Sequence, residues 1–185
     1  MSFIVNASEV PHTPWKNGGG LTQELLTWPE KGDWQLRISL ATIEESGLFS
    51  NFEGVQRTFT IIDGQLTLTF DKIVYTLNHK DEALTFDGSI SCHCHLISVQ
   101  AKALNIMSRS PYATRVVRLD AGGNIKFTDG PCLALFAIEN STVHLGQTEA
   151  VLTMNAKSLF WVENASIDEL NIQSGKVIAC MVFRT

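Results

Sequence analysis

The chain has 185 residues, of which 44% are hydrophobic, and a formal net charge of −5 from 14 basic and 19 acidic residues. This length can close one sizeable hydrophobic core, or two small cores sharing an interface, without a metal ion or disulfides. The acidic balance and the absence of a Lys/Arg run exclude the basic surface that nucleic-acid binding needs, so we expect no nucleic-acid partner.

The N-terminal residues lack the basic and apolar regions of a signal peptide, and no apolar stretch reaches the ~20 residues of a membrane span. We therefore expect a cytoplasmic protein without a membrane partner. The four cysteines are too sparse for a secreted disulfide scaffold, and Cys132 and Cys180 stand among apolar residues. We expect all four to be reduced thiols.

A glycine-rich segment follows, in which Trp15, Lys16 and Asn17 precede three glycines, 18–20. Consecutive glycines expose backbone N–H groups, which could cradle a carboxylate together with Lys16 and Asn17. The alternative is a glycine turn between two strands with Trp15 anchored in the core, and the segment alone favours this turn. It is not a phosphate-binding P-loop, because the Gly-Lys-Ser/Thr order is missing.

Apolar and polar residues alternate with period two in segment after segment, as in 34–40, 65–70 and 142–145. Turn signals such as Asp63-Gly64 and Gly122-Gly123 separate these segments, every eight to twelve residues or so. The pattern predicts half-buried strands in an antiparallel sandwich or barrel. Only 21–26 and 43–46 read as short helical pieces.

Strand phase makes two arginines informative. Arg57 shares its strand face with Phe59 and Ile61, so its charge lies at the end of an apolar face and needs a partner. A carboxylate ligand or Glu24 would satisfy it through charge-assisted hydrogen bonds. Arg37 shares its face with Gln35, Ser39 and Ala41, and that face borders either solvent or a polar cavity.

The residues 92–95 read Cys-His-Cys-His, which suggests a metal site. On a strand, however, the histidines share one face and the cysteines the other, so the four cannot converge on one ion. Further on, Asn105, Met107 and Arg109 share one side of an extended segment. This mixture suits a pocket wall, and an edge strand with a solvated Arg109 explains it equally well.

The order of strand, turn, strand, polar loop and apolar strand in 62–86 recurs weakly in 138–161. Such repetition predicts a duplicated unit. The pattern is interrupted near 108–113, and we therefore predict two halves, 1–110 and 111–185.

Ordered motifs are spread over residues 1–110. They comprise 15–20 with Thr22 and Glu24, Trp34 with Arg37 and Ser39, 47–54, Arg57, Gly64, Phe86, and 104–107 with Arg109. Together these motifs make the chain resemble the HutD/Ves family of bicupin proteins. The resemblance implies an all-β fold, a bicupin in which two cupin-like β-barrel halves form one compact unit, without the usual cupin metal ligands.

The resemblance also implies a cytosolic bacterial protein. HutD members are associated with histidine-utilisation operons and thought to bind a pathway metabolite in a regulatory capacity, whereas Ves members are linked to environmental stress; neither subgroup brings an established reaction. The family segment commonly reads Asp-Leu/Phe-Asn-hydrophobic-Met, and here Ala103 occupies the Asp position. If that Asp orients a pocket arginine or asparagine, we expect ligand specificity to differ here from that of the family.

We expect a metal-independent binding protein, without cofactor, for a small carboxylate metabolite. The expected ligand-binding residues are Trp15, Lys16, Asn17, Glu24, Arg37, Ser39, Arg57, Asn105, Met107 and Arg109. The alternative is a cofactor-free isomerase, lyase or hydrolase, with Glu24 as general base and an arginine stabilising the developing anion. A metal-dependent cupin using His93 and His95 is a third hypothesis, and a homodimer also stays open.

Overall fold

The computed structural model describes residues 1–126, 132–146, 150–163 and 167–185. In this part of the chain the structure consists of β-strands and one short 3₁₀ helix, η1 (Ala7–Glu9), which confirms the all-β prediction. No described helix is both long and apolar enough to cross a membrane.

The predicted helical pieces are wrong. Residues 21–26 belong to strand β3 (Gly20–Trp28), and 43–46 begin with the last residue of β4 (Leu36–Ile43) and continue without helix. A β-bulge between Glu24 and Leu26 interrupts the period-two alternation of β3, so that Leu25 and Leu26 are both buried. Two adjacent buried leucines resemble a helical pattern in the sequence.

The chain divides into two compact units, 10–110 and a unit formed by 1–9 together with 111–185. The division between 110 and 111 coincides with the predicted one, but Met1–Glu9 joins the C-terminal residues. The reason is strand pairing, since β1 (Ser2–Asn6) lies antiparallel to β17 (Ser158–Glu163). We call the two units the N-terminal unit and the C-terminal unit.

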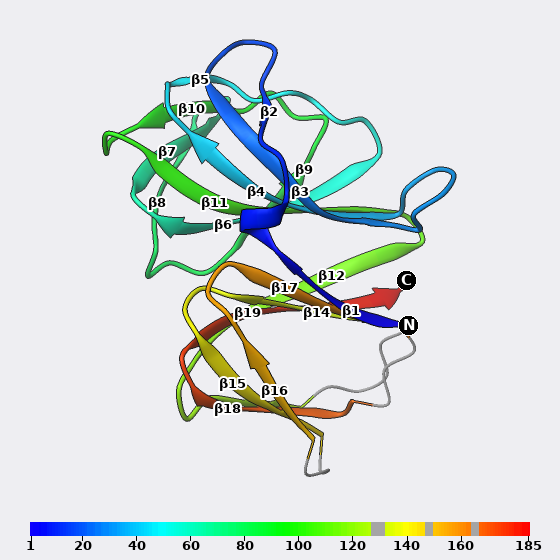
Figure 1. Ribbon diagram of the computed structural model, residues 1–185. Helices are drawn as coiled ribbons and strands as arrows, with labels where there is room; N and C mark the ends of the chain where they lie inside the picture. Colours follow the sequence, from blue (N-terminus) through cyan, green and yellow to red (C-terminus); the bar gives the residue numbers. More distant parts are fainter. Residues whose placement is uncertain (127–131, 147–149, 164–166) are drawn as a thin grey trace. The chain divides into compact units, whose positions relative to one another are not determined.

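The N-terminal unit contains two sheets (Figure 1). The six-stranded sheet has the order β2-β3-β4-β11-β6-β9, and the four-stranded sheet the order β5-β10-β7-β8. Besides β3 and β4, the strands are β2 (Thr13–Pro14), β5 (Gly47–Leu48), β6 (Val55–Asp63), β7 (Gln65–Phe70), β8 (Ile73–Asn78), β9 (Leu84–Asp87), β10 (His93–Leu96) and β11 (Ala101–Arg109).

The C-terminal unit also contains two sheets, with the orders β1-β17-β14-β19-β12 and β13-β18-β15-β16. Its other strands are β12 (Tyr112–Asp120), β13 (Asn124–Lys126), β14 (Cys132–Ala137), β15 (Ser141–Leu145), β16 (Val151–Met154), β18 (Glu169–Ser174) and β19 (Lys176–Arg184).

The two units repeat one topology. In the larger sheets, β4-β11-β6-β9 corresponds to β12-β19-β14-β17, and in the smaller sheets β5-β10-β7-β8 corresponds to β13-β18-β15-β16. All these pairings are antiparallel. The weak internal repeat in the sequence therefore marks equivalent strands, β7 to β9 and β15 to β17.

Each unit buries its own apolar core between its two sheets. In the N-terminal unit Phe59 and Ile61 from the larger sheet pack with Leu66 and Leu68 from the smaller one. The core of the C-terminal unit includes Leu135, Val143, Met154, Leu170 and Ala179. The four cysteines are free and buried, as expected of reduced thiols.

The turn between β6 and β7 gives a test of the fold. Gly64 has φ +82°, and a Cβ there would meet the backbone carbonyl of Gln100 and lie 2.9 Å from the Cα of Ala101. Gly64→Ala should therefore lower the free energy of unfolding by about 2–4 kcal/mol in urea denaturation. Gly32→Ala is the matched control: its φ is +86° but the space is open, so it should cost only about 1 kcal/mol. Equal losses would show that the close backbone approach at Gly64 is unimportant.

Candidate functional site

A cavity of about 830 Å³ opens in the N-terminal unit. Its floor is one face of the six-stranded sheet, and its walls are the segments 13–17 and 48–52. The lining residues are Thr13, Pro14, Trp15, Lys16, Asn17, Thr22, Glu24, Arg37, Ser39, Ala41, Leu48, Phe49, Ser50, Phe52, Arg57, Phe59, Asn105 and Met107. Three of them are cationic and one is a carboxylate, so the cavity is locally positive in an acidic protein.

Strand register places the polar residues on the floor. Arg37 on β4 and Arg57 on β6 both lie opposite Met107 of the central strand β11. In the neighbouring row, Ser39 and Phe59 lie opposite Asn105. Because directly paired residues project from the same face of a sheet, these six side chains share the cavity floor.

Arg57 is buried, with 6% of its surface exposed, and its contacts are to neutral groups. Its Nε and Nη2 donate to the Oδ1 of Asn105 at 3.3 and 3.2 Å, and its Nη1 donates to the carbonyl of Ser50 at 3.3 Å. The guanidinium also lies 5.2–5.5 Å from the ring centroids of Phe49, Phe52 and Phe86. These rings provide cation–π attraction on an otherwise apolar wall.

No carboxylate among the described residues forms an ion pair with Arg57. Burial lowers the pKa of its guanidinium to about 10, so the side chain stays protonated at neutral pH while its charge is disfavoured by roughly 3 kcal/mol. An unpaired, desolvated cation beside a cavity attracts an anion. This arrangement is the main chemical feature of the site.

The sequence left Glu24 as a candidate partner for Arg57, and the structure pairs it elsewhere. The Oε2 of Glu24 lies 2.5 Å from the Nε of Arg37, and its Oε1 accepts a hydrogen bond from the Oγ1 of Thr27 at 2.7 Å. The reason is register: β3 pairs with β4, and the bulge after Glu24 brings Thr27 opposite Arg37. The suggested pairing of Arg57 with Glu24 is therefore wrong.

The glycine-rich segment forms a turn and not an anion cradle. The N–H of Gly18 donates to the carbonyl of Trp15, and the N–H of Gly19 donates to the Oδ1 of Asn17. A side chain at Gly20 would collide with the carbonyl of Thr42 and with the Trp15 ring. The glycines thus let the chain turn closely and leave these two N–H groups already satisfied.

The turn holds two cavity residues in place. Trp15 donates from Nε1 to the Oγ1 of Thr22 at 2.7 Å and meets the edge of Phe49, with ring centroids 5.8 Å apart. Asn17 donates from Nδ2 to the carbonyl of Leu48 at 3.4 Å. Lys16 lies exposed at the rim. The segments 13–17 and 48–52 are therefore tied together across the cavity.

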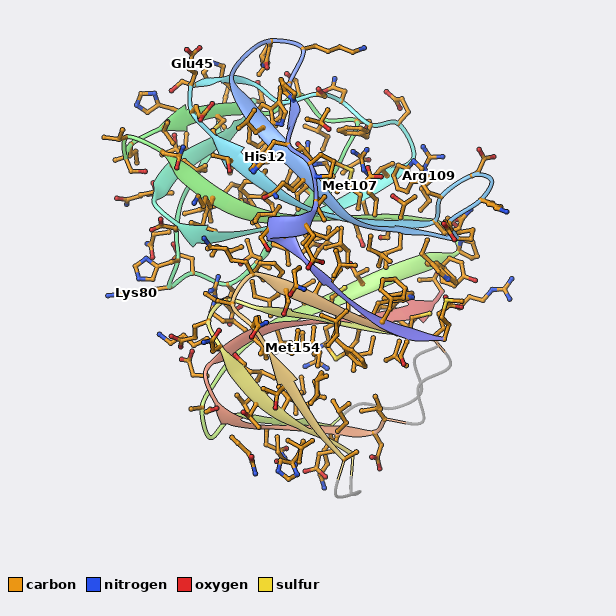
Figure 2. The ribbon with its side chains drawn as sticks, viewed as in Figure 1. His12, Glu45, Lys80, Met107, Arg109 and Met154 are labelled. Carbon is orange, nitrogen blue, oxygen red and sulfur yellow. The ribbon has the colours of Figure 1, made fainter. Side chains whose placement is uncertain are left out.

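Nine of the ten residues proposed from the sequence line the cavity; Arg109 does not. It lies two positions beyond Met107 on β11 (Figure 2), and its guanidinium carbon sits 4.2 Å from the centroid of the Trp34 ring. The strand phase of Arg109 was correct, but its long side chain stacks on Trp34.

The histidines His93 and His95 point away from the cavity. Both are exposed, whereas Cys94 between them is fully buried in the core. The Nδ1 of His95 lies 3.5 Å from the Oγ of Ser46. Within the described ranges, no group of three or more His, Cys, Asp or Glu side chains is arranged to hold a metal ion.

Phe49, Ser50 and Phe52 were not among the proposed site residues, although the structure places them against Arg57. Their segment, 47–54, belongs to the motifs that carried the family resemblance, and this was the available signal. Ala103, the departure from that pattern, is fully buried between Ala41 and Ile61 and does not line the cavity.

The C-terminal unit has the same strand order, but apolar residues occupy several positions that are polar on the cavity floor of the N-terminal unit. By strand register, Leu133 occupies the position of Arg57, Ala179 that of Asn105, and Val117 that of Ser39. Leu133 and Ala179 belong to the apolar core of their unit, and Val117 packs against it. The polar residues of the N-terminal unit are therefore not required by the fold.

Arg57→Met tests whether the cation is retained for function. Because the substitution removes a desolvated charge, the ligand-free variant should be at least as stable as the wild type, by up to about 3 kcal/mol in urea denaturation. Arg115→Met is the control and should change little, because Arg115 lies on β12 of the C-terminal unit, opposite Met181, and is exposed. A loss above about 2 kcal/mol for Arg57→Met alone would make Arg57 a structural anchor.

Comparison with known proteins identifies relatives. The HutD family model matches residues 7–180. An uncharacterized 21.2 kDa protein in the hutC 3′ region of Pseudomonas putida is 30% identical over 138 residues, which cover 72% of each chain. Protein Ves of Citrobacter koseri is 31% identical over 115 residues, or 60% of each chain.

Solved structures share the fold. A conserved protein of unknown function from Pseudomonas aeruginosa PAO1 aligns with a TM-score of 0.87 at 25% identity, covering 99% of both chains. HutD from Pseudomonas fluorescens SBW25 aligns with a TM-score of 0.85 at 24% identity over both whole chains. An oxalate decarboxylase from Lactobacillus farciminis, at 9% identity and a TM-score of 0.68, covers 98% of this chain and 86% of its own. The fold is that of a bicupin, and the chain belongs to the HutD family.

Proposed function

We propose that this protein is a metal-independent, non-catalytic binding protein for a small carboxylate metabolite, acting in the cytoplasm. The observation that carries the proposal is the buried guanidinium of Arg57, which lines the cavity without an ion-pair partner in the described chain. Three of its five N–H groups donate to Asn105 or Ser50, so within the described part of the chain two N–H groups stay available to a ligand.

Asn105 supports the same assignment. Its Oδ1 accepts from Arg57, and this orients its amide so that Nδ2 becomes a further donor at the cavity floor. A carboxylate can accept from both Arg57 and Asn105 in charge-assisted hydrogen bonds. Phe49, Phe52 and Phe59 line the same cavity and would exclude water from the bound group.

The relative in the hutC 3′ region of Pseudomonas putida supports a regulatory role in histidine utilisation as part of this proposal. A protein that binds an intermediate of that pathway without consuming it would report its concentration. Glu24 fits this role better than that of a general base, because its carboxylate is engaged by Arg37 and Thr27.

Isothermal titration with formate, acetate and the intermediates of histidine degradation tests the proposal. We expect saturable binding of at least one carboxylate, with stoichiometry near one, and a loss of affinity on the order of 100-fold in Arg57→Met. Arg115→Met is the control and should bind as the wild type does.

Two results would contradict the proposal. Affinity that survives in Arg57→Met would place the carboxylate elsewhere. Nuclear magnetic resonance can monitor whether the bound compound is converted to product. Conversion that is lost in Glu24→Gln would favour the cofactor-free enzyme.

A further inference from the structure

The cavity floor presents two different electrostatic ends. Arg57 and Arg37 flank Met107 in one row across the sheet. Their Cα atoms are therefore separated by two interstrand spacings, about 10 Å. Arg57 has no ion-pair partner among the residues that the structure describes, whereas Arg37 is already neutralised by Glu24.

The neutralised end can still form hydrogen bonds. Arg37 meets Glu24 through Nε alone, and its two terminal nitrogens have no hydrogen-bond partner in the described part of the chain. Each oxygen of Glu24 has one neighbour, the hydroxyl of Thr27 or the guanidinium of Arg37, and keeps a lone pair to spare. This end thus offers donors from Arg37 and acceptors from Glu24, side by side.

The Arg37–Glu24 pair distinguishes between charged and electroneutral groups of a ligand. A second carboxylate placed on the terminal nitrogens of Arg37 would lie beside the carboxylate of Glu24, and like charges repel at that range. A group that accepts from Arg37 and donates to Glu24, while carrying no net charge, would satisfy both residues. An amide does so, and so does the zwitterionic end of an amino acid.

We propose that the cavity selects a singly charged ligand with two polar ends: a carboxylate at Arg57 and an electroneutral group with both donor and acceptor at the Arg37–Glu24 pair. Met107 lies between the two ends, 5% exposed, and its flexible thioether packs against the aliphatic linker. This inference rests on the carboxylate site at Arg57 and adds the chemistry of the opposite end.

Matched ligand series test the selection by titration calorimetry. Succinate, glutarate and adipate are each compared with their monoamide and with the corresponding amino acid: aspartate, glutamate or 2-aminoadipate. At the best chain length, we expect the monoamide or the amino acid to bind at least tenfold more tightly than the dicarboxylate. The comparison between the two favoured forms identifies whether the neutral end is an amide or a zwitterion.

Glu24→Gln is the informative variant, because it removes the negative charge while keeping the shape. The dicarboxylate should gain at least tenfold in affinity, so that the preference of the wild type shrinks or reverses. Arg115→Met is the control, because Arg115 lies on β12 and does not line the cavity, and it should leave the preference unchanged. The wild-type comparison alone decides the case if Glu24→Gln does not fold.

The outcomes separate this inference from the carboxylate site itself. A dicarboxylate that binds the wild type more tightly than both neutral-ended partners, while still depending on Arg57, overturns the inference and leaves the carboxylate site standing. If no member of the three series binds, or if binding is unaffected in Arg57→Met, both fail.

Discussion

The candidate site is built around one buried guanidinium, beside which the described part of the chain places no paired carboxylate. Arg57 is held by neutral dipoles and aromatic rings, which orient the charge without cancelling it. Each partner imposes a demand on the fold: β11 must place Asn105 beside β6, and the segment 48–52 must cover the guanidinium. Because these demands are met, a protein of net charge −5 keeps a locally positive cavity.

Duplication of the cupin-like unit shows that the fold does not require this arrangement. The C-terminal unit has the same strand order, and it places Leu133 and Ala179 where the N-terminal unit has Arg57 and Asn105. Its apolar core shows that the fold accepts hydrophobic residues at these positions. Polar groups at these positions are expected to lower stability unless a ligand compensates, which is a common property of binding sites.

Period-two alternation was enough to predict the strands, the all-β class and the side of the sheet on which Arg57 and Met107 lie. Contacts between neighbouring strands were harder to predict from the sequence. They depend on which strands pair and in which register, and both are properties of the folded sheet. The bulge after Glu24 is one case: it brings Thr27 opposite Arg37, and both residues contact the Glu24 carboxylate, which no alternation pattern indicates. Arg109 is another, since stacking on Trp34 takes its long side chain out of a cavity that its strand phase suggested.

The central claim is that the Arg57 guanidinium itself receives the ligand's carboxylate. Its most direct test is a titration of arginine Nε–Hε resonances in ¹⁵N-labelled protein, with the Arg57 signal assigned by its absence in Arg57→Met. Saturating ligand should shift the Arg57 resonance and slow its hydrogen exchange. An unchanged Arg57 signal, with ligand bound and other arginine resonances shifted, would contradict it.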